Sequence, residues 1–500
     1  MQGGIIEALS LLLDGFAIAL TLQNVLFVLF GVFLGTVIGM LPGIGPVNAI
    51  AVLFPIVFTI QVPAATVMIF FAGIYYGAQY GNSISAVLLN VPGTSAAAVT
   101  TIEGYTLAKK GLGGKALAMS AIASFSGGTI SIFFLVLFAP LLAKLAISFG
   151  PAEYTVLMVF AFVALSSFSL GSMTKAIISA FLGLAITSVG IDPTTGVNRL
   201  TFGVMELYDG IDFIVVVIGF FAVSELFYMI AEDKNVKTTM QAVTSVMLSL
   251  KEITSSIASI LRSCVSGFII GVLPGAGGTI ASFIGYATEK KLITRDNKFG
   301  SGDLRGIAAP ESANNSASVG AFIPLLILGV PGSETTAVML GGLMSLGIKP
   351  GPLMLELNPE IFWGLAASMF IGNLFLIILN LPLVGVFARI LKTPRWILMP
   401  MIMMLCVVGA YTINGSEFDV FLIIVFGWLG FIMRRANFPM APLILGVVLG
   451  SLIETNFRRA MIYSHGSYSI FFESIICWML WFLAASSLLA PIAIKKLKVR

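Results

Sequence analysis

The sequence contains few charged residues. Lysine, arginine, aspartate and glutamate make up 10% of its 500 residues, against roughly 25% in ordinary soluble domains. Hydrophobic residues account for 58%. A soluble chain of this length could not cover its surface with so few charges, so the composition excludes an ordinary soluble protein.

Histidine and cysteine are also scarce, which removes most catalytic and metal-binding patterns. The single histidine, His465, stands between Tyr463 and Tyr468, where an interfacial position is favoured over a functional one. The three cysteines lie far apart in apolar stretches, as small core residues do, and predict neither disulfides nor a metal centre. The small basic excess fits cytoplasmic loops and indicates no nucleic-acid partner.

Long apolar runs are what the sequence does contain. Runs of about 17–25 residues, enough to cross a hydrocarbon layer of about 30 Å as helices, recur along the whole chain. They include residues 24–40, 63–80, 130–147, 152–170, 211–230, 362–386, 396–411, 418–433 and 470–494. We therefore predict an all-α polytopic membrane protein with about 10–12 transmembrane segments, embedded in a lipid bilayer.

An internal repeat organises these segments. Gly35-x-x-x-Gly39-x-Leu41-Pro42-Gly43-x-Gly45 recurs as Gly267-x-x-x-Gly271-x-Leu273-Pro274-Gly275-x-Gly277. Asn82-Ser83-x-Ser85, followed by Val91-Pro92-Gly93-Thr94, recurs as Asn315-Ser316-x-Ser318, followed by Val330-Pro331-Gly332-Ser333. A third match pairs helices containing Ala139-Pro140 and Leu381-Pro382. Three matches in one order indicate duplication.

The repeat predicts four regions. Residues 1–23 form an amphipathic helix at the membrane interface, and residues 24–230 form the first membrane repeat. Residues 231–261 form a polar cytoplasmic connector, and residues 262–500 hold the second repeat with a C-terminal helix.

Charge predicts that the two copies are inverted in the membrane. Between the glycine motifs, copy one has no basic residue, whereas copy two has five, from Lys290 to Arg305. In the next loop copy one carries Lys109, Lys110 and Lys115, and copy two carries only Lys349. Basic residues collect in cytoplasmic loops, so equivalent loops should lie on opposite faces, as in many secondary transporters. Arg458 and Arg459 fit this pattern poorly.

The glycine-proline motifs predict broken helices. Proline removes a backbone donor and clashes with the preceding turn, and glycine permits a positive φ. The apolar flanks of the second motif, residues 264–273 and 279–287, are too short for two crossings and predict a re-entrant hairpin. Broken backbone persists inside a membrane only beside protein or a water-filled cavity. A helical kink for packing alone is the structural alternative.

Four paired breaks with polar neighbours predict a substrate site where the repeats meet. Helices that restart after Pro-Gly offer free N–H groups to an anion such as a carboxylate. The predicted substrate-binding residues are Asn82, Ser83, Ser85, Pro92, Gly93, Thr94, Ser95, Asn314, Asn315, Ser316, Ser318, Pro331, Gly332, Ser333 and Thr335. No arginine lies in the predicted hairpins to mark a di- or tricarboxylate.

Coupling to an ion is predicted at the breaks and at nearby acids. Free carbonyl groups at broken helices can hold Na⁺, and carboxylates inside a membrane are rare and functionally suggestive. The predicted coupling residues are Pro42, Gly43, Gly45, Pro274, Gly275, Gly277, Glu311 and Glu334, with Glu103 as a further acid for which a structural role is the alternative. We expect no cofactor and no metal other than Na⁺.

These motifs resemble the large membrane subunit of the tripartite tricarboxylate transporter family. The resemblance rests on GMLPGIGP, YGNSISAVLLNVPGTSAAAVTTIEGYTLAKKG, GVLPGAGGTIASFIGY and GIAAPESANNSASVGAFIPLLILGVPGSETTAVMLGG, and covers nearly the whole chain. It implies a non-enzymatic permease of the bacterial inner membrane that imports carboxylates such as citrate by using an ion gradient. It also implies two partners, a small four-helix membrane subunit and a periplasmic solute-binding protein. Similarity to other inverted-repeat carboxylate transporters favours an elevator mechanism.

Two other classes of function remain as alternatives. An intramembrane enzyme would need a nucleophile–base pair or two facing aspartates, and the sequence offers neither pattern. A channel or scaffold subunit is the second alternative, against which the paired breaks argue. The particular carboxylate, the choice between Na⁺ and H⁺, and the oligomeric state, a homodimer among the options, stay open.

The charge pattern generates a topology test. Single cysteines introduced at Gln61 and Asn297 should react with an impermeant thiol reagent from opposite faces, Gln61 from outside and Asn297 from inside. Labelling of both positions from one face would contradict the inverted arrangement.

Overall fold

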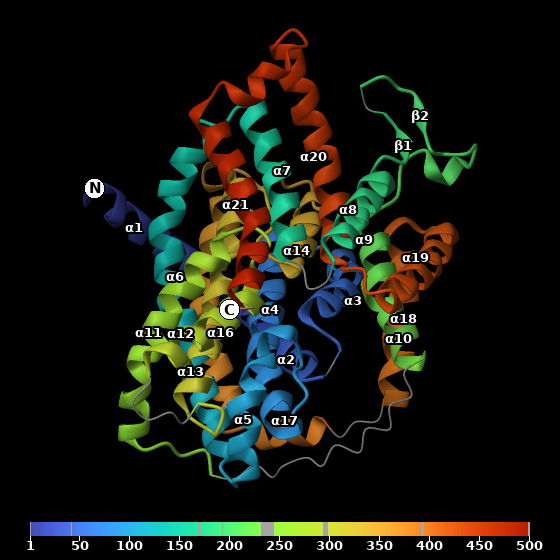
Figure 1. Cartoon of the computed structure of the whole chain (residues 1–500). Coiled ribbons are helices and arrows are strands. Elements are labelled where there is room, and N and C mark those ends of the chain that lie inside the picture. The colour runs from blue at the N-terminus through green and yellow to red at the C-terminus, as the bar shows by residue number, and fades with distance from the viewer. Residues whose placement is uncertain are drawn as a thin grey trace.

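The computed structural model describes residues 2–41, 43–168, 172–192, 194–231, 245–293, 299–391 and 395–498, and these are almost entirely helical (Figure 1). Helix α1 (Gln2–Ala19) precedes the first copy. The first copy contains α2 (Leu22–Gly39), α3 (Pro46–Thr59), α4 (Ala64–Leu89), η1 (Ser95–Ala98), α5 (Thr100–Lys109), α6 (Gly113–Ala146), α7 (Pro151–Phe168), α8 (Met173–Thr187), β1 (Gly190–Ile191), β2 (Asn198–Arg199), η2 (Met205–Leu207), α9 (Phe213–Val217), η3 (Ile218–Val223) and α10 (Ser224–Ala231).

The second copy repeats much of this order. It contains α11 (Leu250–Val272), α12 (Gly277–Leu292), α13 (Arg305–Gly320), η4 (Pro324–Leu328), α14 (Glu334–Ser345), α15 (Met354–Leu357), α16 (Pro359–Asn380), α17 (Val384–Ile390), α18 (Arg395–Asn414), α19 (Glu417–Arg435), α20 (Ala441–Tyr463), η5 (Tyr468–Phe472) and α21 (Ile475–Lys498). Both η3 and η4 are π-helical turns.

The helices confirm an all-α polytopic membrane protein. Among the described residues, six helices are long and apolar enough to cross a membrane, and five shorter apolar helices accompany them. The six are Leu22–Gly39, Gly113–Ala146, Phe213–Ala231, Leu250–Val272, Pro359–Asn380 and Ala441–Tyr463. Strands β1 and β2 form one short antiparallel pair that pairs Gly190 with Arg199.

Two helices, α4 and α13, form the centre of the protein. Nearly every residue of α4 and every residue of α13 after Arg305 is buried. Helix α4 packs against α2 and α16, and α13 packs against α11, α12 and α6. Because protein surrounds both helices, their polar residues avoid lipid, which is the condition for polar groups at membrane depth.

Glycines let these central helices approach their neighbours in the same way in both copies. A Cβ atom at Gly35 would lie 2.3 Å from the carbonyl oxygen of Ile74 in α4. At Gly267, the equivalent position, it would lie 2.4 Å from the carbonyl oxygen of Ala313 in α13. Backbones this close leave no room for a side chain, so the repeated glycines serve helix packing as well as the breaks.

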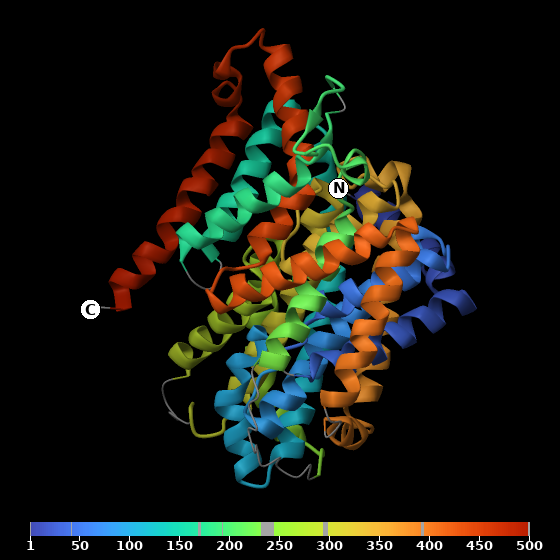
Figure 2. The same ribbon diagram turned by 90° about the vertical axis from the view of Figure 1, so that its right-hand side faces the viewer.

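The remaining long helices form two groups beside this centre. Helices α7, α8, α20 and α21 pack together, and α19 packs against η3, α10 and α18. Figure 2 shows α21 running along the margin of the molecule beside α7. The N-terminal helix α1 packs against α16, with Gly15 directly over the backbone of Trp363. Its placement at a membrane interface stays a prediction.

Helix α11 corrects one prediction about the second copy. It runs unbroken over 23 residues from Leu250 to Val272, so the segment before the second motif is long enough to cross a membrane and is not a short re-entrant arm. The sequence is misleading here because the first turns of α11 are polar. Their polar groups have partners: Glu252 pairs with Lys115 at 2.7 Å, and Arg262 pairs with Glu289 at 2.7 Å.

The predicted connector therefore overlaps α11, and residues 232–244 of it lie outside the described residues, as does Asn297 of the topology test. The copies also differ at the third repeated motif. Helix α6 continues through Pro140, whereas a turn separates α16 from α17 around Pro382.

An ion-pair network explains why Arg458 departs from the charge pattern. Its Nη2 donates to Asp192 at 2.9 Å and to Glu454 at 2.7 Å, and Arg199 also donates to Glu454 at 2.9 Å. A hydrogen bond from the Thr194 N–H and the Arg458 guanidinium hold the pKa of Asp192 well below its usual range. Since acids compensate its charge, Arg458 is a weak indicator of the cytoplasmic side.

Glu103 ties the two copies together. Its buried carboxylate accepts hydrogen bonds from the Tyr286 hydroxyl at 2.9 Å and from the N–H groups of Gly302 at 2.7 Å and Asp303 at 2.9 Å. The N–H of Gly300 donates to it as well. The acid joins α5 of copy one to the chain that leads into α13 of copy two, which is a structural role.

This contact predicts the effect of Glu103→Gln. The amide would present a donor to N–H groups that need an acceptor, and hydrogen bonds to charged groups are worth about 1.5–3 kcal/mol each. We expect a lower apparent unfolding temperature in detergent. Glu206→Gln, at an exposed position beside the β1–β2 hairpin, is the control. An unchanged unfolding temperature for Glu103→Gln would contradict this role.

Candidate functional site

The first pair of breaks lies after α2 and α11. Gly43 has a φ of +91°, and Gly275 and Gly277 have φ values of +80° and +57°. A Cβ atom at Gly275 would lie 2.5 Å from Cα of Leu165 in α7, and one at Gly43 would lie 2.9 Å from Oε1 of Glu225 in α10. Each of these two breaks therefore contacts a helix outside the central pair α4 and α13. Pro42 lies outside the described residues.

The second pair of breaks ends α4 and η4 in the left-handed conformation, at Asn90 and Gly329. The chain is then extended at Thr94 and Ser333 and begins η1 and α14. A Cβ at Gly93 would lie 1.8 Å from the carbonyl oxygen of Gly39. The two kinds of break in copy one are therefore packed directly against each other. In copy two, the N–H of Gly275 donates to the carbonyl of Gly332 at 3.1 Å.

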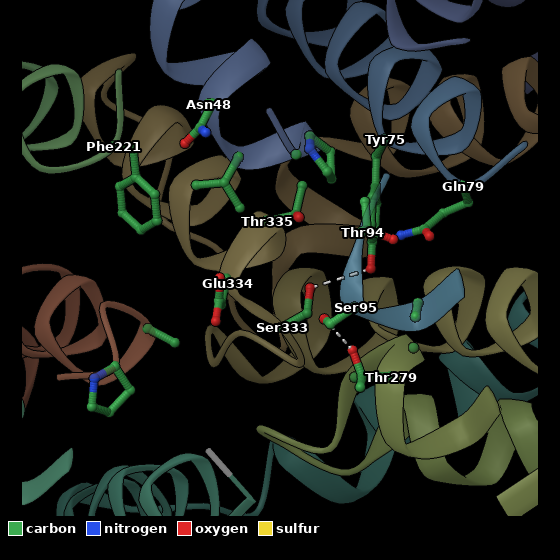
Figure 3. Close-up of a pocket in the computed structure, with 18 of the residues that line it drawn as sticks. Asn48, Tyr75, Gln79, Thr94, Ser95, Phe221, Thr279, Ser333, Glu334 and Thr335 are labelled. Carbon is green, nitrogen blue, oxygen red and sulfur yellow. Dashed lines mark hydrogen bonds between the residues drawn. The ribbon is translucent and has the colours of Figure 1, made fainter. Parts of the chain in front are cut away.

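Hydrogen bonds connect the breaks of the two copies (Figure 3). The Tyr75 hydroxyl of α4 lies 3.3 Å from the hydroxyl of Ser333. Ser95 of η1 lies 2.8 Å from Thr279 of α12. Helix α14 of copy two also packs on α3 of copy one, and η1 of copy one on α12 of copy two. The copies therefore meet at their breaks.

A cavity of about 470 Å³ lies at this meeting point. Ten of the predicted residues line it, namely Gly43, Gly45, Gly93, Thr94, Ser95, Gly275, Gly277, Ser333, Glu334 and Thr335. The outer helices close it through Leu165 of α7, Phe221 of η3, Arg434 of α19 and Ala441 of α20. All four breaks and both groups of outer helices thus contribute to one space.

Two helix beginnings in the cavity differ in their capping. Ser333 accepts from the Thr336 N–H at 3.3 Å while Thr336 accepts from the Ser333 N–H at 2.8 Å, a capping box that prepares α14. Thr94 makes no such cap, and its hydroxyl accepts from Nδ2 of Asn82 at 2.7 Å. The N–H groups that follow both residues suit an anion.

Asn82, Ser83 and Ser85 do not line this cavity. Asn82 reaches its edge through Thr94, whereas the hydroxyls of Ser83 and Ser85 donate to carbonyl groups of their own helix. Pro92 is also absent from the cavity wall.

The equivalent residues of copy two are buried in α13. Ser316 donates to the carbonyl of Cys264, and Ser318 donates to the carbonyl of Asn314 at 3.0 Å. Asn315 donates to the carbonyl of Glu311 at 3.0 Å. Neither these residues nor Pro274, Pro331 and Gly332 line the cavity.

The two predicted coupling acids have different surroundings. The Glu334 side chain is exposed in the cavity at the first turn of α14. Glu311 is buried away from it and accepts hydrogen bonds from Thr100 at 2.5 Å and Ser124 at 3.4 Å. Only Glu334 is placed to meet a ligand in this cavity.

Arg434, Tyr75, Gln79, Asn48 and Thr279 line the cavity and were not predicted from the sequence. Arg434 stands in a basic pair at the end of an apolar helix, where it resembles an ordinary cytoplasmic flank. Its partner Glu225, an acid in the interior of the apolar run 211–230, was the available signal.

Three buried side-chain carbonyl oxygens near the breaks have no hydrogen-bond donor among the described residues, those of Asn82, Asn314 and Asn315. Oxygen atoms of this kind suit a hard cation. Within the described ranges, no group of three or more histidine, cysteine, aspartate or glutamate residues is placed to hold a metal ion.

The cavity predicts which hydroxyls affect binding. Thr94→Ala and Ser333→Ala should each weaken binding of a carboxylate, the ligand predicted from the sequence, about tenfold, the effect of roughly 1.4 kcal/mol, because each loses a polar group at a helix beginning. Ser83→Ala is the control, since Ser83 lies outside the cavity. Concentration-dependent uptake, corrected for surface expression, measures this, and equal affinity in all three variants would contradict it.

Gly93→Val should abolish transport, because no position of the side chain avoids the carbonyl of Gly39. Gly385→Val is the matched control, since a Cβ atom at the exposed Gly385 meets nothing within 4 Å. Uptake by well-expressed Gly93→Val at the parental rate would contradict the close packing of the breaks.

Comparison with known proteins identifies the family of this chain. The family model of the tripartite tricarboxylate transporter TctA family matches residues 25–445. An uncharacterized 52.8 kDa protein in the TAR-I ttuC' 3' region of Agrobacterium vitis is 44% identical over 465 residues, which cover 93% of this chain and 92% of the relative.

A second similar protein is an uncharacterized protein in the TAR-II ttuC' 3' region of the same organism. It is 47% identical over 205 residues, which cover 41% of this chain and 85% of the relative. No solved structure matches the chain significantly. The family match spans all four breaks and the cavity, and the chain belongs to the tripartite tricarboxylate transporter TctA family.

Proposed function

We propose that this chain is the permease subunit of a binding-protein-dependent secondary transporter that imports carboxylates. Membership of the TctA family supports a transporter subunit. The observation that carries the proposal is the single cavity at the four breaks, lined by the helix beginnings at Thr94 and Ser333. N–H groups there would bind a carboxylate by charge-assisted hydrogen bonds, worth about 1.5–3 kcal/mol each.

Transport in this proposal is driven by a gradient of Na⁺ or H⁺. Glu334 supports it, because a carboxylate exposed in an anion-binding cavity would repel the substrate unless a proton or cation neutralises it. The unpartnered oxygens of Asn82, Asn314 and Asn315 offer ligands for Na⁺.

The position of the cavity favours an elevator-type movement. Its walls come partly from the central breaks and partly from α7, η3, α19 and α20, so sliding of the centre past these outer helices would carry the cavity across the membrane. The direction of access in each state follows from the predicted inverted orientation of the copies.

The family also supports the partners of the proposed transporter. We propose that a small four-helix membrane subunit joins this chain in the bacterial inner membrane, and that a periplasmic solute-binding protein delivers the substrate. The chain itself then supplies the translocation path and carries out no covalent chemistry.

Uptake of radiolabelled citrate and succinate by vesicles tests this function. Vesicles holding the permease and the small subunit should accumulate substrate only with the binding protein and an imposed Na⁺ or proton gradient. Glu334→Gln should be expressed normally and change the dependence on Na⁺ or pH, because it removes a titratable group from the cavity. Ser255→Ala, on α11 away from the cavity, is the control.

Two outcomes would count against the proposal. Equilibration of substrate without accumulation, independent of the binding protein, would indicate a channel. Unchanged Na⁺ and pH dependence in Glu334→Gln would remove that residue from coupling.

A further inference from the structure

One ion pair lies at the edge of the cavity and joins the two copies. Arg434, in the last turn of α19, donates through Nη1 to Oε2 of Glu225, in the first turn of α10. The Glu225 side chain is 6% exposed and that of Arg434 is 25% exposed. Arg434 belongs to the cavity wall and Glu225 does not, so the arginine and not its partner is placed to contact a ligand there.

The guanidinium group has donors to spare. It carries five N–H bonds, and among the described residues Glu225 is its only hydrogen-bond partner. The group is planar and can bind a carboxylate through two parallel hydrogen bonds, which a lysine cannot do. A donor pair that remains free at a cavity wall is suited to an anionic ligand.

Among the described residues, Arg434 is the only basic side chain that lines the cavity, and Glu334 is the only acidic one. Glu225 lies against Gly43, in the break after α2, where a Cβ atom would be 2.9 Å from its Oε1. It therefore compensates the charge of Arg434 when the cavity is empty and holds its position. An arginine at this depth without such a partner would carry a large desolvation cost.

We propose that Arg434 binds one carboxylate group of the transported substrate and that Glu225 is the positioning residue that orients it. This rests on the proposed carboxylate transport. The substrate is then held between two kinds of donor, the guanidinium on an outer helix and the N–H groups at the central breaks. The contact would thus change as the centre moves relative to α19.

Direct binding to the purified chain in detergent tests the proposal, with citrate and succinate as probes in isothermal titration calorimetry. Replacing Arg434 alone would leave Glu225 buried without a partner, which destabilises a fold. The informative variant is therefore Arg434→Gln/Glu225→Gln, which removes the pair as a unit. We expect it to stay folded and to bind citrate about tenfold or more weakly.

The conservative variant Arg434→Lys keeps the charge and loses the planar pair of donors. It should also bind citrate about tenfold more weakly, and Glu225→Gln should weaken binding less, because the arginine remains. The control is Arg199→Gln/Glu454→Gln, which removes an ion pair that lies outside the cavity. Its citrate affinity should equal that of the parent.

Each outcome has a separate meaning. Citrate affinity equal to the parent in both Arg434 variants would overturn the role of Arg434 while leaving carboxylate transport intact. Absence of citrate and succinate binding by the parent itself would overturn both proposals. A folded double variant with weakened binding, beside an unaffected control pair, is the supporting result.

Discussion

Close backbone packing of α2 on α4 and of α11 on α13 is the constraint on which the rest of the structure depends. Gly35 and Gly267 occupy equivalent places in these contacts, where a Cβ atom would meet a carbonyl oxygen of the neighbouring helix. Because the helices touch at this distance, the breaks that end α2 and α11 are brought beside those that end α4 and η4. The cavity results from this arrangement.

Most polar side chains of the central helices make their hydrogen bonds to other groups of the protein. Ser83 and Ser318 donate to carbonyl groups of their own helices, and Glu103 is surrounded by donors from the other copy. Unpaired buried polar groups cost several kcal/mol at membrane depth, so these bonds are a condition of folding. A smaller set, which includes Thr94, Glu334 and Arg434, faces the cavity and remains available to a ligand.

The outer helices contribute more to the cavity than the repeated motifs suggest. Leu165 of α7 lies against Gly275, in the break after α11. Glu225 of α10 lies against Gly43, in the break after α2. Both contacts join the centre to helices outside the glycine-proline motifs. On the side of α19 the wall is completed by Arg434, which is held by its ion pair with Glu225 and belongs to no repeated motif.

The sequence by itself determined the membrane character, the duplication and the positions of the breaks, because apolar length, proline and glycine act locally. Ten predicted residues also line the cavity. Only the tertiary structure decided which of the predicted polar residues lie outside the cavity, such as Ser83 and Asn315. The face that a helix turns to a cavity depends on the helices packed around it. It also decided the start of α11, whose polar turns are paired across helices by Lys115 and Glu289. The role of Arg434 in the cavity wall could also be found only from the tertiary structure, because its partner Glu225 is 209 residues away in the chain.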